Sequence, residues 1–399
     1  MANLREVERV IQMSQPRGPG SDEERQMASF VAGRLERLGV PHTQIDFRTV
    51  RGTATLYLVP FLGILVSIGL AWFYPLAGLI GSTIFALIAV LEATNRPLIS
   101  RIFRLDKSQN VLGLIPHQPP EGFEDADPLR QVVLIAPLDS PRLGWLDGRT
   151  MRNSIRGLTL LALFSVMAIP LMIAAWLFLE EELLLFLAGI PAFIVFLSLF
   201  FIMQRDLAGK AVPGRNSNGS GIAAMLAMAE DLMRHPPVGV ETLLVFTGAS
   251  QSGSAGMTNF LGENEFNPET TYFISLESVG RGPICFTRAE GPIFSLQSSP
   301  GMVHIAGEIA LSHPERLMRP IVHRGIPTEQ YAALIRGYQA MTIMGHPDPK
   351  ESTAPPEAVA GDEIDPYEID SACLLVHGII RRLDDEAVSG NVLGMDYPD

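Results

Sequence analysis

The sequence predicts an α/β domain, with a mixed, centrally parallel sheet sandwiched by helices, that carries four transmembrane helices as two hairpin insertions. Two long stretches of the 399 residues contain almost no charge. Elsewhere, short apolar and β-branched runs alternate with amphipathic segments, which is the pattern of an α/β fold. We expect one discontinuous soluble domain made of 1–51, 92–156 and 205–399, and hairpins at 52–91 and 157–204.

The first hairpin is predicted from a stretch between Gly52 and Leu91 that contains no Asp, Glu, Lys or Arg. A helix of about 40 residues would be about 60 Å long, twice the thickness of a hydrocarbon core. The stretch must therefore form two spans. We place the break at 71–75, where aromatic residues suit the membrane interface and Pro75 suits a turn.

The second hairpin is predicted between Arg156 and Arg205, where the only charges are those of Glu180, Glu181 and Glu182. These charges divide the stretch into two spans of about 22 residues, enough for a hydrocarbon core.

Basic residues predict the orientation of the hairpins. Lys and Arg flank both ends of each hairpin, whereas the two outer turns have none. Because each hairpin has an even number of spans, its flanks lie on one side, which the positive-inside rule makes cytoplasmic. We expect an integral protein of an inner or plasma membrane with a cytoplasmic soluble domain. Two distant cysteines, Cys285 and Cys373, suit a reducing compartment, and the charged N-terminus is unlike a signal peptide.

Charge also restricts the function. A formal net charge of −13 and a pI of about 5.1 argue against nucleic acid as a partner, because phosphates require clustered Lys and Arg. The predicted spans contain no Asp, Glu, Lys, Arg or His, which argues against transport by a monomer. The composition directly predicts one partner, the lipid bilayer. It does not predict the oligomeric state.

The soluble elements follow from local pattern. Ser21 to Glu24 has the spacing of a capping box and begins an amphipathic helix that ends at Gly39. A Gly- and Ser-rich turn begins a second helix after Asn218, and 371–383 predicts a closing helix. Strands are expected at 42–50, 110–116, 132–140, 242–249 and 271–278, with a helix near 257–261.

Three segments, RGPGSDEERQMASFVAGRLERLG, VVLIAPLDS and GRNSNGSGIAAMLAMAEDL, give the chain a resemblance to a known fold. It resembles the di-zinc exopeptidases of metallopeptidase clan MH, which include secreted aminopeptidases, glutamate carboxypeptidase and glutaminyl cyclases. The clan also includes the non-enzymatic domains of nicastrin and the transferrin receptor. The resemblance extends from about Arg5 to Leu383, with the hairpins as insertions.

The resemblance implies a metal site whose residues are mostly replaced here. The strand that should end in His-x-Asp has Pro137 in place of the histidine and keeps Asp139. The aspartate that bridges both metals is replaced by Ser217, and the asparagine that follows it is kept as Asn218.

The remaining positions of the site are also altered. Ser250 and Gln251 stand where the family has two glutamates, a general base and a ligand. Glu277 takes the place of a ligand aspartate, and His346 is the nearest candidate for the last histidine, with Pro355 as the alternative.

Coordination chemistry makes zinc binding by this set unfavourable. Zinc needs three or four nitrogen, carboxylate or thiolate donors, and two neighbouring metals need a bridging carboxylate. Pro, Ser, Ser and Gln supply none of these, and no base remains at position 250 to take a proton from water. We therefore expect no metal and no catalysis, with Asp139 and Glu277 as hydrogen-bonded remnants; zinc would be the cofactor if the alternative, an active metallopeptidase, held.

Two short segments are similar to other kinds of site. GASQSG at 248–253 is similar to a nucleophile elbow around Ser250, although its fifth position is serine. Its partner histidine would have to be one of His304, His313, His323 or His346. GRNSNGSG could bind an anion at a helix N-terminus, with Arg215 nearby. An ordinary strand-to-loop turn and an ordinary helix cap are the simpler interpretations.

The resemblance also implies where the cleft lies. If 42–50, 110–116 and 132–140 are successive antiparallel strands, as in the family, the first and third run the same way. Both hairpins then leave the edge of the sheet where α/β folds place ligand clefts. We expect a cleft that faces the inner leaflet, in a pseudo-peptidase that binds a membrane-proximal protein, a peptide or a lipid headgroup as a scaffold or regulator. A hydrolase with an atypical site is the alternative.

Overall fold

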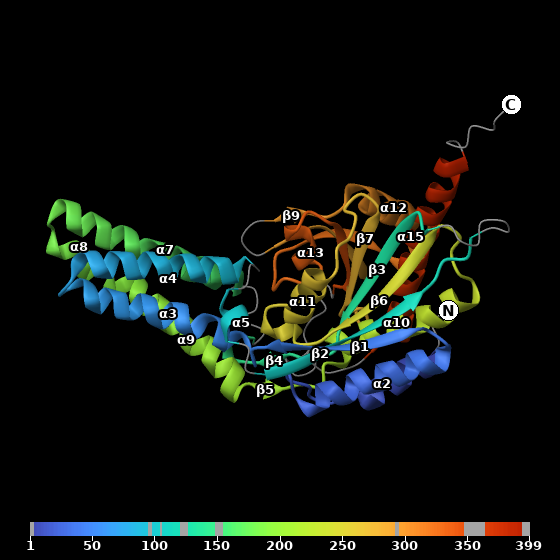
Figure 1. The fold of residues 1–399 in the computed structure, drawn as a ribbon, viewed down its shortest axis with the longest axis horizontal. Coiled ribbons are helices and arrows are strands. Elements are labelled where there is room, and N and C mark those ends of the chain that lie inside the picture. The colour runs from blue at the N-terminus through green and yellow to red at the C-terminus, as the bar shows by residue number, and fades with distance from the viewer. Residues whose placement is uncertain are drawn as a thin grey trace.

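The computed structural model of the protein describes residues 4–94, 98–103, 106–119, 127–147, 155–291, 295–346 and 364–392. These residues form an α/β part and a bundle of apolar helices that projects from one side of it (Figure 1).

The main sheet has the strand order β1-β2-β6-β3-β7-β11-β8-β10, with β9 paired to β8 at its side. Its strands are β1 (His42–Thr49), β2 (Asp106–Ile115), β3 (Arg130–Pro137), β6 (Val240–Thr247), β7 (Thr271–Glu277), β8 (Ile284–Glu290), β9 (Leu296–Gln297), β10 (Arg319–His323) and β11 (Gln339–Gly345). The central strands β6, β3, β7 and β11 are parallel, whereas β1, β2 and β6 pair antiparallel. The predicted mixed, centrally parallel sheet is therefore confirmed.

One predicted pairing is wrong. The segments 110–116 and 132–140 were expected to be neighbours, but β2 pairs with β6, and β6 lies between β2 and β3. The order of strands along the chain does not indicate the pairing of β2 with β6, because β6 enters the sheet only after the crossover through helix α10 (Ser220–Arg234). β1 and β3 still run in the same direction, since two antiparallel pairings and one parallel pairing separate them.

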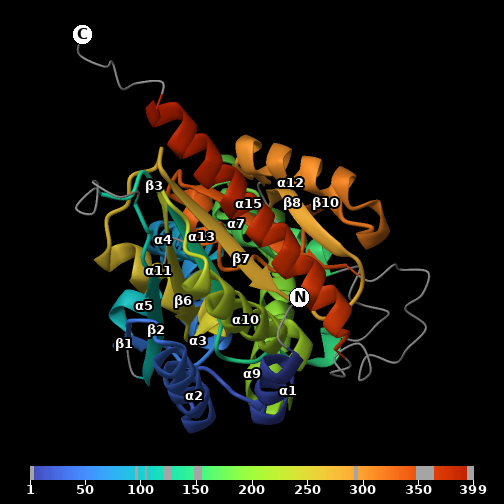
Figure 2. The ribbon, with the colours of Figure 1, turned by 90° about the vertical axis from the view of Figure 1, so that its right-hand side faces the viewer.

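Helices cover both faces of the sheet (Figure 2). Along β3, Val132, Leu134 and Ala136 pack against one set of helices, and Val133 and Ile135 pack against another, as the two-residue period of a strand requires. The first set is α1 (Leu4–Met13), α2 (Asp22–Leu38), α10, α12 (Pro300–Ser312) and α15 (Pro366–Val392). The second set is α11 (Ala255–Glu263) and α13 (Tyr331–Ile335).

The predicted ends of α2 are confirmed, but the capping box is only half formed. The Ser21 side chain accepts from the main-chain N–H of Glu24 at 3.2 Å, and Gly39 ends the helix in the left-handed conformation with φ of 75°. The Glu24 carboxylate does not bond to Ser21; it accepts from the N–H of Gly20 at 2.9 Å and turns into the sheet edge described below.

Four helical segments are long and apolar enough to cross a membrane. They are α3 (Thr53–Ala71), α4 (Pro75–Ala93), α7 (Ile155–Leu179) and the pair α8 (Glu182–Leu187) and α9 (Gly189–Ala208). The breaks fall at Trp72–Tyr74 and Glu180–Glu181, as the aromatic turn and the glutamates predicted.

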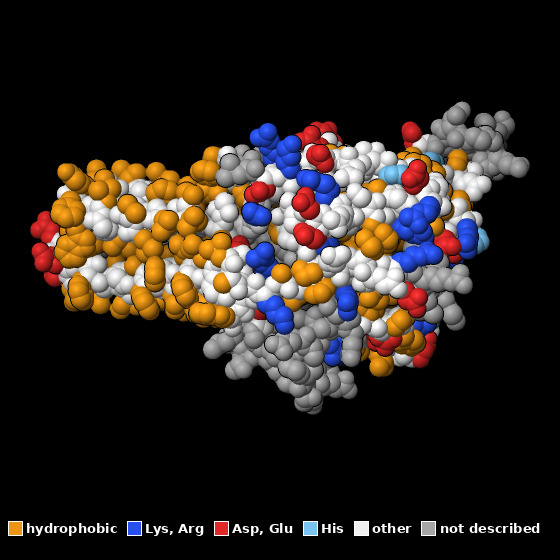
Figure 3. Space-filling view, turned by 90° about the horizontal axis from the view of Figure 1, so that it is seen from below, with side chains coloured by type: hydrophobic (Ala, Val, Ile, Leu, Met, Phe, Trp, Pro, Cys, Tyr) orange, Lys and Arg blue, Asp and Glu red, His pale blue; other side chains and the backbone are white. Residues whose placement is uncertain are grey.

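On the face seen in Figure 3 the bundle exposes apolar side chains along its length, and acidic side chains gather at its far tip. Only 28–33 % of each candidate span is buried inside the protein. A continuous apolar surface of this kind is typical of helices that face lipid, not water. All four helices enter the soluble part at the same end of the bundle (Figure 1).

The bundle is attached to the sheet edge by polar contacts. Thr53, the first residue of α3, donates its hydroxyl to the main-chain oxygen of Gln251 at 2.9 Å and accepts from Arg205 of α9 at 2.8 Å. Asp206 accepts from the N–H of Ala54 at 2.6 Å. Two helices of different hairpins therefore meet each other, and the loop after β6, at one point.

We predict that the acidic tip and the soluble part lie on opposite sides of the membrane. A cysteine placed at Glu181 should react with a membrane-impermeant maleimide in intact cells or spheroplasts. A cysteine at Lys210 should react only after permeabilisation. A permeabilised sample controls for the reactivity of each cysteine, and the native Cys285 and Cys373, which are buried, give the background labelling. Labelling of the cysteine at Lys210 in intact cells would show that the orientation is the opposite of the predicted one.

Candidate functional site: the carboxyl edge of the sheet

The structure brings most of the predicted site residues to one edge of the sheet. Asp139 lies two residues after β3, and Ser250 and Gln251 follow β6. Glu277 ends β7, and His346 follows β11 directly. These four strands are parallel, so their carboxyl ends meet where α/β folds place their ligand sites.

Asp139 holds the loop after β6 that contains Ser250 and Gln251. It is fully buried, and its two carboxylate oxygens accept from the main-chain N–H groups of Ser250 at 3.1 Å and Gln251 at 2.8 Å. The side-chain amide of Asn218 donates to the main-chain oxygen of Asp139. Burial, and then the charge of Glu24, raise the pKa of Asp139 well above its usual range.

Pro137 and Ser217 have structural contacts at this edge. Pro137 lies opposite Thr247 in the register of β3 with β6. The main-chain oxygen of Ser217 accepts from the N–H of Ser278 at 2.7 Å and so fixes the start of α10 to the end of β7. The N–H groups of Asn218 and Gly219 donate to the oxygen of Gly214, so they are already used within the turn. This use weakens the anion-binding interpretation of GRNSNGSG.

Glu277 shares the site with a carboxylate that the sequence did not single out. Its Oε1 accepts from the hydroxyl of Ser275 and from the main-chain N–H of Glu329, both at 2.9 Å. Burial raises the pKa of Glu277 to about 8, and the neighbouring charges of Glu329 and Glu290 add to the rise.

Glu329 is the main residue that sequence reasoning missed. It lies in the connection between β10 and α13, is 1 % exposed, and raises the pKa of both Asp139 and Glu277 by its charge. Burial raises its own pKa, and the nearby hydroxyls of Ser250, Ser254 and Thr247 lower it in part. Neither of its carboxylate oxygens completes a hydrogen bond of normal geometry.

Two further buried glutamates support this arrangement. Glu24 accepts from the N–H of Ala249 at 2.6 Å and from the hydroxyl of Ser108 at 2.8 Å, and burial raises its pKa. Glu290 accepts from the N–H of Thr328 at 2.5 Å and from its hydroxyl at 3.0 Å, which positions the residue before Glu329. Glu24 was expected only as part of a helix cap, and Glu290 was not expected.

The donors at this edge do not fit a pair of zinc ions. Asp139 directs both oxygens at amide hydrogens, and Glu277 directs one at the N–H of Glu329. Among the described residues, no three His, Cys, Asp or Glu side chains are grouped so that they could hold a metal ion. His346 lies at the same edge, where its main-chain N–H donates to Pro283 at 3.1 Å. Pro355 lies outside the described residues.

The nucleophile-elbow interpretation of Ser250 finds little support in the geometry. Ala249 and Ser254, on either side of it, have positive φ values of 51° and 53°, so the turn is sharp. The N–H groups of Ser250 and Gln251, however, are bonded to Asp139 and are not available to an oxyanion. His304 is on α12 beside Glu308, at 3.4 Å.

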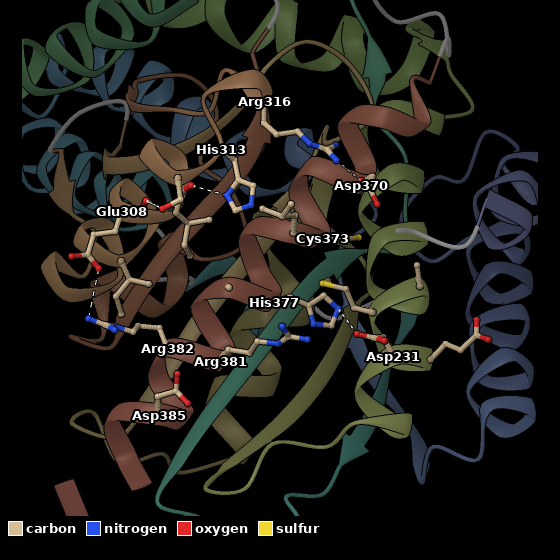
Figure 4. A pocket seen from close by; sticks show the side chains of 18 of the residues that line it. Asp231, Glu308, His313, Arg316, Asp370, Cys373, His377, Arg381, Arg382 and Asp385 are labelled. Atoms are coloured by element: carbon tan, nitrogen blue, oxygen red, sulfur yellow. Dashed lines mark hydrogen bonds and ion pairs between the residues drawn. The ribbon is translucent and has the colours of Figure 1, made fainter. Parts of the chain in front are cut away.

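A separate groove of about 950 Å³ lies between α10, α12 and α15, away from this edge (Figure 4). Arg316 forms an ion pair with Asp370 at 2.9 Å, and His377, whose pKa is lowered by burial, lies 3.6 Å from Asp231. The opposite charges in the groove neutralise one another, so the groove has no single chemical preference.

Comparison with known proteins shows the fold and not the activity. No protein-family model and no curated protein sequence matches the chain. Among solved structures, the glutaminyl cyclase of an Acidobacteriales bacterium has a TM-score of 0.54 at 12% identity, over 96% of this chain and 93% of its own. The zinc aminopeptidase BSAP of Bacillus subtilis has a TM-score of 0.54 at 12% identity, over 96% and 95%. The soluble part has the fold of the zinc aminopeptidases and glutaminyl cyclases.

A third similar structure is a Zn-dependent exopeptidase from Parabacteroides distasonis, with a TM-score of 0.51 and 14% identity over 94% of this chain and 96% of its own. The resemblance stated from the sequence is thus confirmed at the level of the fold. At such low identity the comparison assigns no activity, which has to be argued from the residues present.

We predict that Asp139→Ala destabilises the soluble part by about 2–4 kcal/mol, because two buried N–H groups lose their acceptor. The thermal unfolding midpoint of the detergent-purified protein should fall clearly. Asp22→Ala, which removes a side chain that is 87% exposed, should leave the midpoint unchanged. Equal midpoints for the two variants would show that Asp139 does not hold the loop.

We predict that stability decreases as the pH rises from about 5 to about 8. The folded state keeps a proton on Glu277 up to about pH 8, whereas an unfolded glutamate releases it near 4.5, so rising pH favours the unfolded chain. Each proton that the folded state retains and the unfolded state releases lowers the free energy of unfolding by about 1.4 kcal/mol per pH unit. Glu277→Gln should flatten the dependence of the unfolding midpoint on pH; the exposed Glu265→Gln should not. An unchanged slope in Glu277→Gln would contradict the assignment.

Proposed function

We propose that this protein is a membrane-embedded pseudo-peptidase that binds the membrane-proximal segment of a partner protein as a scaffold or regulator. The observation that supports it most is the use of Asp139, the acid that the family keeps beside its zinc-binding histidine: both of its carboxylate oxygens are bonded to the loop at Ser250 and Gln251. A carboxylate used in this way stabilises a fold and is not free to bind a metal.

The buried Glu329 supports the same proposal. An acidic side chain that enters the space between Asp139 and Glu277 adds negative charge without adding a histidine or a bridging aspartate. Burial raises the pKa of Glu329, which works against the ionised form that a metal ligand must have.

The attachment of the site to the bundle supports a partner at the membrane. Thr53 bonds to the main chain of Gln251, and Ser252 donates its hydroxyl to the oxygen of Val50 at 2.8 Å. The edge that would bind substrate in a peptidase therefore abuts the start of a candidate span, in reach of the membrane surface. We place this surface on the cytoplasmic side of an inner or plasma membrane. A partner's juxtamembrane segment fits this position better than a free soluble peptide.

The first test is metal content and turnover. Detergent-purified protein exposed to zinc and then dialysed should retain less than about 0.1 metal ion per chain, because the donor set is too small. It should release no amino acid from aminoacyl-nitroanilides and should not cyclise N-terminal glutamine. Tightly held zinc, or turnover that a chelator abolishes, would instead establish an active metallopeptidase; turnover that only Ser250→Ala abolishes would establish a serine hydrolase.

The second test looks for the partner. A photoreactive amino acid placed at Arg51, an exposed residue beside the start of α3, should crosslink to a membrane protein in intact membranes. The same amino acid at Arg381, in the distant groove of Figure 4, is the matched control. Crosslinks to the same proteins from both positions would contradict a binding surface at the membrane.

A further inference from the structure

A short segment outside the four spans packs against the end of α9. It contains β4 (Arg142–Leu143) and the helical turn Trp145–Asp147, and β4 pairs antiparallel with β5 (Lys210–Ala211), which directly follows α9. The main-chain N–H of Trp145 donates to Oε1 of Gln204 at 2.9 Å. The Trp145 ring lies 6.0 Å from the ring of Phe200. The segment is thus fixed beside residues 200–204 of α9.

The position along α9 sets the depth of this segment in a bilayer. The candidate span Glu182–Ala208 has 27 residues and is about 40 Å long. A hydrocarbon core of about 30 Å that starts at the acidic tip ends roughly at Ile202. Trp145 therefore lies level with the boundary between hydrocarbon and headgroups, where Trp and Tyr are enriched in membrane proteins.

Large apolar side chains are exposed at this level. Trp145 is 67% exposed and Leu207 is 73% exposed. Across the base of the bundle, Ile102 and Phe103, at the end of the short helix α5 (Ile99–Ile102), are 64% and 40% exposed. These side chains extend the apolar surface of the bundle to its base. A contiguous apolar surface indicates an interaction site, whereas single exposed apolar residues do not.

The charges beside these side chains are basic. Arg142 is exposed, and its guanidinium donates to the main-chain oxygen of Asp206 at 2.9 Å, so that bond does not neutralise it. Lys210 is also exposed. Two acids lie nearby: Asp206 is 3.5 Å from Arg205, which offsets its charge, and Asp147 accepts from the N–H of Gly144 at 2.7 Å, so Arg142 and Lys210 leave basic charge in excess.

We propose that Arg142–Asp147, together with Leu207–Ala211 at the end of α9, forms a second membrane contact at the base of the bundle. Trp145 and Leu207 enter the headgroup boundary, and Arg142 and Lys210 bind the phosphates of anionic phospholipids. This surface continues the apolar surface of the bundle, and its charge is complementary to an anionic leaflet. The proposal rests on the four helices being membrane spans, but not on the pseudo-peptidase assignment.

Depth-dependent quenching tests the apolar half of the contact. The chain has three tryptophans, Trp72, Trp145 and Trp176. A Trp72→Phe/Trp176→Phe variant reports on Trp145 alone, and a Trp145→Phe/Trp176→Phe variant reports on Trp72 in the outer turn. Both are placed in nanodiscs with lipids brominated near the headgroup or near the bilayer centre.

Trp145 should be quenched more strongly by the shallow bromines than by the deep ones. Quenching of Trp72 without quenching of Trp145 would overturn the proposed contact and leave the spans intact. Absence of quenching for both would show that the helices are not embedded, which would remove the basis of the proposal itself.

Lipid binding tests the basic half. Native mass spectrometry of the protein released from nanodiscs with phosphatidylglycerol should show that Arg142→Gln/Lys210→Gln lowers the affinity for the anionic lipid about tenfold or more, relative to phosphatidylcholine. Arg381→Gln/Arg382→Gln removes the same charge from exposed positions in the distant groove and should change nothing. An equal loss in the two variants, or none in the first, would overturn the assignment of these two residues.

Discussion

The carboxylate of Asp139 is the contact on which the rest of the sheet edge depends. It is buried at the end of the central strand and holds the loop after the neighbouring strand by two N–H groups. Burying a carboxylate is costly unless hydrogen bonds compensate, and two charge-assisted bonds do so in part. The turn needs such support because Ala249 and Ser254 both adopt left-handed backbone conformations that side chains disfavour.

The same loop is also held from the membrane side. Thr53 bonds to Gln251 from the first residue of a candidate span, and Arg205 reaches Thr53 from another hairpin. The loop thus lies between a rigid sheet and a rigid bundle, with a polar contact to each. Any movement of α3 relative to α9 must change the contacts of Gln251. The position of the sheet edge and the position of the bundle are therefore coupled through one short segment.

The sequence predicted the parts of the structure that local pattern encodes. Forty uncharged residues cannot be one span, and the aromatic turn and the three glutamates mark the breaks, so both hairpins were predictable. β3 was predictable from a β-branched run and α2 from Ser21 and Gly39. The pairing of β2 with β6 was not predictable, because it depends on the position in the sheet to which the crossover through α10 brings β6. The role of Glu329 was not predictable, because a single glutamate in an irregular connection belongs to no sequence pattern. Only the structure shows that it interacts with Asp139 and Glu277.

Three acids, Asp139, Glu277 and Glu329, interact electrostatically at this edge. In a di-zinc site, carboxylates are kept charged by the cations that they bind. In the proposed pseudo-peptidase, Pro137 and Ser217 stand in place of a zinc-binding histidine and the bridging aspartate, so the remaining acids lack the positive charge that would keep them ionised. Protons can neutralise them instead, and the pKa of Glu277, raised to about 8, places its own proton exchange near neutral pH. Burial shifts the pKa of Glu329 in the same direction, and the hydroxyls of Ser250, Ser254 and Thr247 oppose that shift, so hydroxyl groups take part in accommodating the acid at this edge.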